Sequence, residues 1–337
     1  MLKNVIKRRD VAKAAGVSLT TVTHALNHKL GTRVNPDTRA RIKKIAKEMG
    51  YRPNFVGRAL VTGKSFTVGL MQPGYEAMLR LFYQRIIYGA VTAMNKDDYN
   101  LLLTFRDNAY SYLRNINQGR VDGIIVLQSD FDDIHINKII DTDIPTVVVN
   151  RTQHFEPGSN GCCVASDHSK VIREIMSGMA KQGCRSIIAI NDYNSCDPNR
   201  RLGDACVVMA DELRDKGVTV ERLIPSLASF PTQMLEMFKS KPCPDAIYID
   251  GEIMIEPLAK AARRAGLKPG EDFLLAVTDA YKEKSSYSAP VTFYEQQPEL
   301  TGETAWQMMK KKIAGEPVPE LTLIPYKKQN PRVKART

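Results

Sequence analysis

One predicted helix near the N-terminus has an apolar face and, opposite it, a face of short and medium side chains. The residues of that second face are Leu19, Thr20, Thr23, His24 and Asn27. A helix with such a protruding face can lie in the major groove of DNA, where its side chains reach base edges. Taken alone, the pattern also fits an ordinary helical hairpin whose polar face meets water.

The residues before this helix predict a helix-turn-helix. A stripe at helical spacing predicts a preceding helix and comprises Val11, Ala14 and Ala15. Gly16 follows at once, where a reversal of the chain needs a residue that adopts positive φ. Ser18 can cap the second helix, because its hydroxyl can accept a hydrogen bond from a backbone N–H near Thr21.

A third helix is predicted in the same basic segment, where Asn35 is a good cap, Pro36 suits the first turn and Gly50 ends the helix. Its apolar stripe comprises Ile42, Ile45, Ala46 and Met49. This three-helix arrangement resembles the DNA-binding head of the lactose-repressor (LacI/GalR) family. The motifs that carry the resemblance are Asp10-Val11-Ala12, Ala15-Gly16-Val17-Ser18, Thr21-Val22, Leu26-Asn27, Thr38-Arg39 and Gly50-Tyr51-Arg52-Pro53-Asn54.

The resemblance implies roles for the exposed residues of this head. The residues at base-facing positions are Leu19, Thr20 and His24. The residues at phosphate-gripping positions are Ser18, Thr21, Thr23 and Asn27. His24 replaces the arginine usual in the family, so we expect a different preferred operator. Arg8 is a second departure, because the family usually has an apolar residue there, a role that Ile6 can fill.

The resemblance also implies a hinge helix after the head, which folds on operator DNA as a pair across a dimer. The residues at its minor-groove positions are Asn54, Arg58 and Leu60, and Leu60 is expected to wedge into a central base step. Gly57 replaces the usual alanine and costs about 1 kcal/mol in a helix interior, so folding of the hinge should depend more on DNA. The alternative is that Leu60 only anchors the linker on the body.

The charge of the chain is concentrated at its ends. The net charge is +11 over 337 residues, with 25% charged and 43% hydrophobic residues, as in ordinary globular proteins. Residues 1–66 hold fifteen basic and three acidic residues, a net of +12, and residues 327–337 hold five basic and no acidic residues. The body between them is therefore net −6. Only the head is expected to meet a polyanion, and the last eleven residues are expected to be disordered.

The sequence offers little for catalysis, metals or membranes. It has no Walker loop, no G-x-S-x-G and no metal-spaced cluster, and Asp167-His168-Ser169 are too close in sequence to converge as a triad. Asp167 instead predicts a helix start. We therefore expect no enzyme activity and no cofactor. The six cysteines lack metal spacing, and no signal peptide or long apolar run is present, which indicates reduced thiols in a cytoplasmic, nucleoid-associated protein.

Valine and isoleucine runs alternate with predicted helices from residue 65 onward. The predicted strands are 67–71, 99–105, 121–127, 144–150, 186–190, 246–249, 273–277 and 290–294. The predicted helices are 82–96, 111–118, 169–182, 204–216, 256–265 and 299–313. Such alternation predicts parallel strands covered on both faces. It resembles a periplasmic-binding-protein-like body.

The predicted fold is an all-α helix-turn-helix head followed by an α/β body of two doubly wound parallel-sheet subdomains. The predicted divisions are a head at 1–53, a hinge at 54–65, one subdomain at 66–164 and 292–323, the other at 165–291, and a tail at 324–337. The strand at 290–294 is expected to cross back to the first subdomain.

A small molecule is expected where such bodies bind one, at the carboxyl ends of the strands. The effector-binding residues implied by the resemblance are Asn150, Arg200 and Asp279. Further candidates are Tyr75 and Tyr83, which could form an aromatic wall, and Gln297, which follows the strand at 290–294. Polar residues also occur at strand ends that bind nothing, which is the alternative for each residue singly.

These features predict an effector-responsive repressor that binds a pseudo-palindromic operator in double-stranded DNA as a homodimer, with a sugar or sugar derivative as effector. The alternatives are a sugar-binding protein or sugar-processing enzyme with a similar body. A further variant is a regulator whose body binds a partner protein. No leucine-heptad tail is present, which favours a dimer over a tetramer, and no membrane partner is expected.

Overall fold

The structure is a computed structural model that describes residues 6–26, 33–51, 59–60, 62–74, 78–106, 110–127, 134–152, 155, 159–191, 197–224, 226, 228–240, 242–278 and 290–329. The chain divides into two compact units, Met1–Lys64 and Ser65–Thr337, which we call the head and the body.

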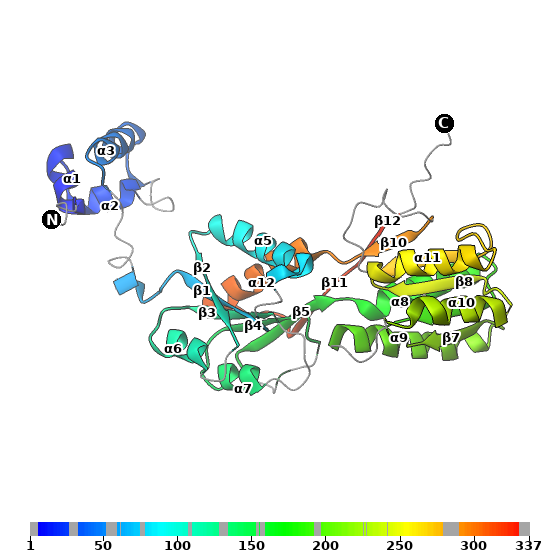
Figure 1. Ribbon diagram of the computed structural model, residues 1–337. Coiled ribbons are helices and arrows are strands. Elements are labelled where there is room, and N and C mark those ends of the chain that lie inside the picture. The colour runs from blue at the N-terminus through cyan, green and yellow to red at the C-terminus, as the bar shows by residue number, and fades with distance from the viewer. Residues whose placement is uncertain are drawn as a thin grey trace, which may run out of the picture. The chain divides into compact units, whose positions relative to one another are not determined.

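In its described residues the head includes the helices α1 (Arg8–Ala15), α2 (Leu19–Leu26) and α3 (Pro36–Glu48) (Figure 1). Gly16 adopts φ 62°, as the predicted reversal requires, and Ser18 Oγ accepts from Thr21 N at 3.1 Å. The Asn35 side chain caps α3. The buried core of the head comprises Val11, Ala12, Ala15, Val22, Ala25, Ile42 and Ala46. The prediction for Ala14 was wrong, because α1 turns Ala12 inward and leaves Ala14 exposed.

The first lobe of the body is built on a parallel sheet in the order β11-β5-β4-β3-β1-β2. Its strands are β1 (Thr67–Gln72), β2 (Asn100–Phe105), β3 (Gly123–Leu127), β4 (Thr146–Val149), β5 (Gly161–Ser166) and β11 (Leu321–Ile324). The core on one face includes α5 (Leu81–Asn95) and α12 (Pro298–Ile313), and the core on the other includes α6 (Ser111–Asn117) and α7 (Ile134–Ile140). Both faces are therefore covered, as the continuous apolar runs predicted.

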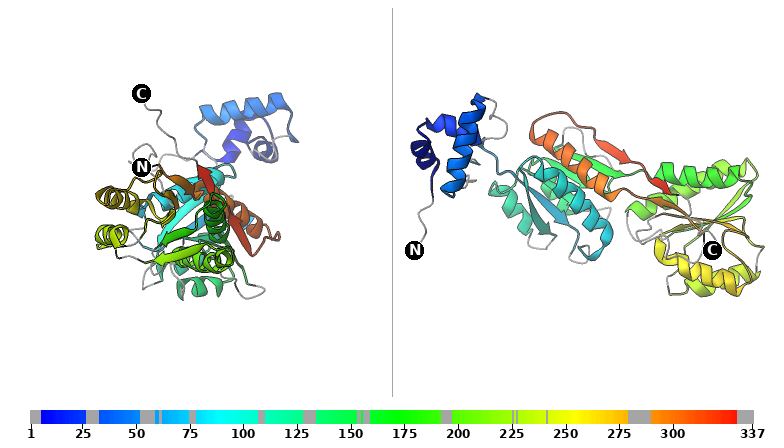
Figure 2. Two further views of the ribbon diagram at one scale, coloured as in Figure 1. Left: turned by 90° about the vertical axis from the view of Figure 1, so that its right-hand side faces the viewer. Right: turned by 90° about the horizontal axis from the view of Figure 1, so that it is seen from above.

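The second lobe repeats this plan, with the strand order β12-β10-β9-β8-β6-β7. Its strands are β6 (Ser186–Ile190), β7 (Thr219–Leu223), β8 (Ala246–Asp250), β9 (Leu274–Thr278), β10 (Thr292–Glu295) and the antiparallel β12 (Lys327–Gln329). Its helices are α8 (His168–Lys181), α9 (Asp197–Arg214), α10 (Phe230–Ser240), α11 (Ile255–Arg264) and the short η3 (Glu252–Met254). Figure 2 shows this sheet between α8 and α9 on one side and α10 and α11 on the other.

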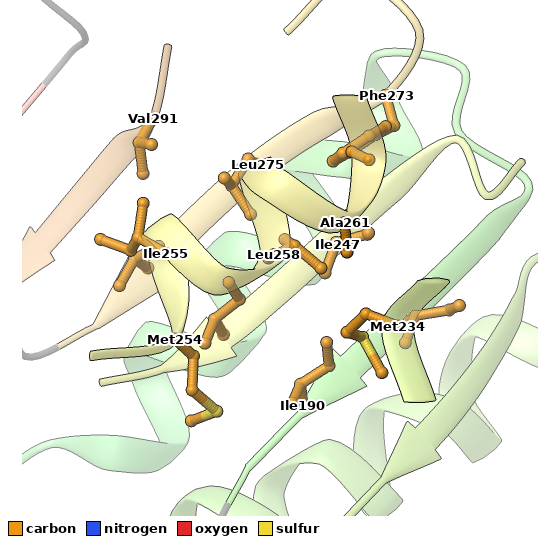
Figure 3. Close-up of a cluster of buried hydrophobic side chains, with 14 of the residues drawn as sticks. Ile190, Met234, Ile247, Met254, Ile255, Leu258, Ala261, Phe273, Leu275 and Val291 are labelled. Atoms are coloured by element: carbon orange, nitrogen blue, oxygen red, sulfur yellow. The ribbon is translucent and has the colours of Figure 1, made fainter. Parts of the chain in front are cut away.

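The core between this sheet and α10–α11 is drawn in Figure 3. Ile190, Ile247 and Leu275 project from neighbouring strands toward Met234 of α10 and Leu258 of α11. All five side chains are buried, so the sheet and the two helices exclude water from each other. This packing fixes the strand ends from which the ligand candidates project.

The two lobes share a device that sets where their strands begin. The Asp122 carboxylate accepts backbone N–H groups of Ser65 and Phe66, at 2.6 and 2.9 Å, just before β1. The Asp245 carboxylate does the same for Arg185 and Ser186 before β6. These backbone hydrogen bonds lower the pKa of Asp245. Each lobe thus locks its first strand to the loop before its third.

Two expectations about the last part of the body were wrong. The predicted strand 290–294 is β10, and it pairs with β9 in the second lobe; the chain crosses back only after it, into α12. The predicted disordered tail begins with β12, because Lys327–Gln329 finds an open edge at β10. Residues 330–337 lie outside the described part of the chain.

Helices α5 and α12 approach each other through two glycines. A Cβ on Gly302 would collide with the Ile86 carbonyl oxygen, and one on Gly89 with the Glu299 carbonyl oxygen. Arg85 crosses the same contact and donates Nε to Glu299 at 2.5 Å and Nη1 to Glu295 at 2.9 Å. Two helices far apart in the sequence, at Leu81–Asn95 and Pro298–Ile313, are thereby packed backbone against backbone.

We expect Gly302→Ala to lower the free energy of unfolding by about 1–3 kcal/mol, because the methyl group forces the helices apart. Gly178→Ala is the control, since Gly178 lies inside α8 with nothing near its Cβ position. It should raise that free energy by about 0.5–1 kcal/mol. Urea unfolding of the full chain measures both changes, and equal stability of the two variants would contradict the close packing.

Candidate DNA-binding and ligand-binding sites

The predicted base-contacting residues lie together on the exposed side of α2. Leu19 is 51% exposed, Thr20 is exposed, and His24 is half-buried one turn further along. Val22 and Ala25 on the opposite side are buried in the head core. The second helix of the head therefore presents the side chains that a recognition helix needs.

The hydroxyl groups predicted to grip phosphates already make hydrogen bonds within the head. Ser18 Oγ and Thr21 Oγ1 lie 2.8 Å apart, and Thr23 Oγ1 donates to Leu19 O at 2.8 Å. Each hydroxyl oxygen has further lone pairs, but these bonds show that the groups also hold the turn of α2. Asn27 lies outside the described residues.

Leu60 is the one predicted hinge residue that the structure describes. It lies in a helical turn closed by the hydrogen bond from Gly63 N to Ala59 O, at 2.8 Å, and it is 81% exposed. The role of Leu60 as a minor-groove wedge stays a prediction, as does the alternative that it anchors the linker. Asn54 and Arg58 lie outside the described residues.

The connections of the body make the carboxyl ends of its two sheets face each other. The chain leaves β5, β10 and β11 at their carboxyl ends and each time enters the other lobe, at α8, α12 and β12. The crossing segments are tied together: Ser166 Oγ donates to Gln296 Oε1 at 2.6 Å, and Asp167 N donates to Ile324 O at 2.8 Å. Ligands of open parallel sheets bind at this edge.

Two buried carboxamides at this edge were missed by the sequence analysis. Gln72 ends β1, and Asn191 follows β6, the corresponding strand of the second lobe. Both side chains are fully buried, and neither has a hydrogen-bond partner for its oxygen or its nitrogen within the described structure. A buried amide without partners is costly, so each points to a bound molecule or water. The signal in the sequence was a single amide residue closing an apolar strand.

Of the predicted ligand residues, Asn150 fits best. It follows β4 with φ 62°, it is 5% exposed, and its Oδ1 has no hydrogen-bond partner within the described structure. In the second lobe a buried chain of hydrogen bonds occupies the strand ends: Tyr248 Oη lies 2.9 Å from Thr278 Oγ1, which donates to Asp250 Oδ1 at 2.9 Å. The Asp250 carboxylate thus already accepts a hydrogen bond from within the protein.

The other predicted ligand residues divide into three groups. Tyr83 is buried in the core of the first lobe, so its role is packing and we no longer expect it in the site. Gln297 Nε2 donates to Pro325 O at 2.8 Å and helps to tie the crossing segments. Arg200 belongs to α9, but its side chain, together with Tyr75 and Asp279, lies outside what the structure describes.

Asp167-His168-Ser169 has a structural explanation. Asp167 Oδ1 caps α8 by accepting from Lys170 N at 3.0 Å, as the predicted helix start requires. His168 is buried, with Nδ1 2.8 Å from the Tyr326 hydroxyl across the crossing. Burial, helped by the positive charge of Arg201, lowers the pKa of His168 to about 3. The imidazole is therefore neutral in the folded protein and braces the crossing segments.

Buried thiols in the described part of the body are held protonated. Five cysteines are free in the described part of the chain, and burial raises the pKa of Cys162 to about 11 and that of Cys206 to about 12. Thiols held protonated in this way are poor nucleophiles. No helix in the described ranges is both long and apolar enough to cross a membrane.

Two segments of the sequence match known families of protein domains. Residues 8–54 match the lacI family of bacterial regulatory proteins, and residues 177–332 match the periplasmic binding protein-like domain. The regulator RegA of Clostridium saccharobutylicum is 37% identical over 145 residues, which is 42% of each chain. The repressor PurR of Erwinia tasmaniensis is 27% identical over 325 residues, 91% of this chain and 90% of PurR.

Solved structures show the same architecture. A lac repressor dimer bound to operator and the anti-inducer ONPF matches with a TM-score of 0.71 at 18% identity, covering 98% of this chain and 99% of that one. A complex of the regulator CelR with cellobiose matches with a TM-score of 0.65 at 22% identity, over 97% and 99%. The fold is thus a helix-turn-helix head on a periplasmic-binding-protein-like body. Residues 8–54 are a DNA-binding domain of the lacI family of bacterial regulatory proteins and residues 177–332 a periplasmic-binding-protein-like domain, which confirms the predicted resemblance and fold class.

The buried His168 predicts a loss of stability in acid. Its pKa is about 6.5 when unfolded and about 3 when folded, so below pH 6.5 the unfolded chain binds the extra proton. The stability that depends on the neutral ring is complete above pH 6.5 and falls by about 1.4 kcal/mol per pH unit below it. The Tyr326 hydroxyl contacts the ring, and the positive charge of Arg201 disfavours its protonation.

We expect His168→Gln to flatten this part of the pH profile of urea unfolding between pH 6.5 and 5. The control is His135→Gln, which removes a histidine that lies 2.9 Å from another tyrosine hydroxyl, that of Tyr112. This control should keep the acid loss of the unchanged protein. A His168→Gln profile as steep as that of the unchanged protein would show that His168 does not cause the loss.

Proposed function

We propose that this protein is a transcriptional repressor that binds a pseudo-palindromic operator as a homodimer. A sugar or sugar derivative that binds between the lobes of its body raises or lowers its affinity for the operator. The observation that carries the proposal is the row Leu19, Thr20 and His24 on one side of α2 in a LacI-family head, opposite the buried Val22 and Ala25. Its place of action would be the cytoplasm, on the nucleoid. The basic head supplies the charge that phosphates require.

Exposed apolar residues of the first lobe support the homodimer. Leu81 and Tyr88 lie two turns apart on α5 and are 49% and 67% exposed, and Leu79 just before the helix is 82% exposed. Apolar side chains gathered on one helix face mark an interaction surface, and the occupant we propose is the same helix of a second copy. Two-fold symmetry would then place two recognition helices on the two halves of a palindrome.

A neutral, hydroxyl-rich effector suits the strand ends. Gln72, Asn150 and Asn191 are buried amides, which offer donors and acceptors without net charge, as sugar hydroxyls do. The relatives named above are regulators, which supports a regulator over a sugar-binding protein or a sugar-processing enzyme. A regulator whose body binds a protein partner is the remaining alternative, and saturable sugar binding separates the two.

Selection of bound duplexes from a random DNA pool tests the operator claim. We expect the full chain to recover a short palindrome with a central pyrimidine–purine step, which the Leu60 wedge would open. His24→Arg should change the selected base at one position in each half-site, because arginine prefers guanine. Lys43→Arg, at an exposed site on α3, is the control and should leave the palindrome unchanged. Binding that is salt-sensitive but blind to sequence would contradict the proposal.

A panel of sugars and sugar derivatives tests the ligand claim through the melting temperature of the protein. We expect at least one compound to raise it, and Asn191→Leu to abolish that rise, because leucine has a similar shape but no polar atoms. The variant itself should be as stable as the unchanged protein, since a buried polar group without partners is removed. Asn137→Leu on the exposed side of α7 should keep the response. An unaltered response of Asn191→Leu would exclude this residue from the site.

A further inference from the structure

Arg8, which stands where the family usually has an apolar residue, joins three elements of the head. It is the first residue of α1 and is half-buried. Its Nη1 donates to Thr23 Oγ1 of α2 at 3.2 Å, and its Nε donates to the hydroxyl of Tyr51, after α3, at 3.4 Å. Tyr51 is also packed against the head core and immediately precedes the segment that leads to the hinge. One guanidinium therefore links the recognition helix to the root of the linker.

The contact with Thr23 continues to the start of the recognition helix. Thr23 Oγ1 donates its own proton to Leu19 O at 2.8 Å, which leaves its lone pairs to accept from Arg8. A chain of donors thus runs from Arg8 through Thr23 to the backbone of Leu19, the first base-facing residue. Movement of Arg8 would therefore shift the first turn of α2, which carries the proposed base-contacting residues Leu19 and Thr20.

We propose that Arg8 is a positioning residue, which holds recognition helix α2 in register with the linker root at Tyr51 through the planar fork of its guanidinium. The inference rests on the proposed function, because positioning matters only if α2 reads an operator. Arginine can donate in two fixed directions at once, whereas a lysine ammonium is a point charge on a flexible stem. Shape, and not charge alone, is what the head requires at position 8.

The neighbouring Arg9 provides a matched control. Its side chain is 76% exposed and forms a loose salt bridge with Asp10, with Nε 3.8 Å from Oδ1. Arg8→Met and Arg9→Met remove the same charge from adjacent positions. Only the first removes the link between α2 and Tyr51.

The test compares the affinity of the full chain for its selected operator with its affinity for random duplex, at two salt concentrations. We expect Arg8→Met and Arg8→Lys each to lower operator affinity at least tenfold more than random-duplex affinity. Arg8→Lys should do so with an unchanged salt dependence, because its charge is kept. Arg9→Met should lower both affinities by the same factor. If Arg8→Lys binds the operator like the unchanged protein, the proposal is overturned.

Thr23→Val keeps the test decisive if the Arg8 variants unfold the head, which circular dichroism would reveal. Valine preserves the shape of threonine but accepts no hydrogen bond, so we expect the same selective loss of operator affinity. In the Arg8→Met, Thr23→Val double variant the two losses should not add, because both break one link. Additive losses, or full operator affinity of Thr23→Val, would overturn the proposal. An unchanged protein with no sequence preference would instead overturn the proposed function.

Discussion

The direction of parallel strands is the constraint on which the body depends. Parallel strands end at the same edge, and the described part of the chain crosses between its lobes from such ends, after β5, β10 and β11. The crossing segments hold one another through Ser166 and Gln296, and through His168 and Tyr326. Polar side chains at the strand ends therefore face the opposite lobe. The place of a ligand follows from topology before any individual residue is considered.

The first lobe connects this edge to the surface proposed for dimerisation. Arg85 of α5 binds Glu295 at the end of β10 and Glu299 at the start of α12, and Glu295 also accepts from Gln329 Nε2 at 2.6 Å. The same helix α5 exposes Leu81 and Tyr88. A change in the angle between the lobes would thus act on α5 directly, which gives the proposed effector a physical route to the dimer.

Local signals allowed much of the head and the order of the body to be predicted from sequence. Caps such as Ser18 and Asn35 act within one turn, so their residue types suffice to place them. The strand β5 was missed because Gly161-Cys162-Cys163-Val164-Ala165-Ser166 lacks the bulky branched residues of its neighbours, although it is buried between β4 and β11. The strand β12 was missed because its residues Lys327–Gln329 are polar, and only the open edge of β10 makes them a strand.

In the candidate sites, too, local features were predicted from sequence, whereas features that depend on long-range packing were missed. The face of α2 that is proposed to meet DNA follows from helical spacing, so the sequence predicted its residues as one group. Gln72 and Asn191 were missed because they belong to different sheets, and only the crossings show that their strand ends face the same region. Tyr83 was predicted as part of an aromatic wall of the site, but the packing of α5 on the first sheet takes its ring into the core. Long-range packing, which sequence spacing does not encode, made these differences.

The central claim is that a ligand at the facing strand ends changes the grip of the head on DNA. It is tested most directly by measuring the dissociation constant of a fluorescently labelled, selected operator with and without a saturating concentration of a sugar that raises the melting temperature. The account predicts at least a tenfold change, which corresponds to about 1.4 kcal/mol of coupling. An unchanged dissociation constant, with the sugar shown to be bound, would contradict it.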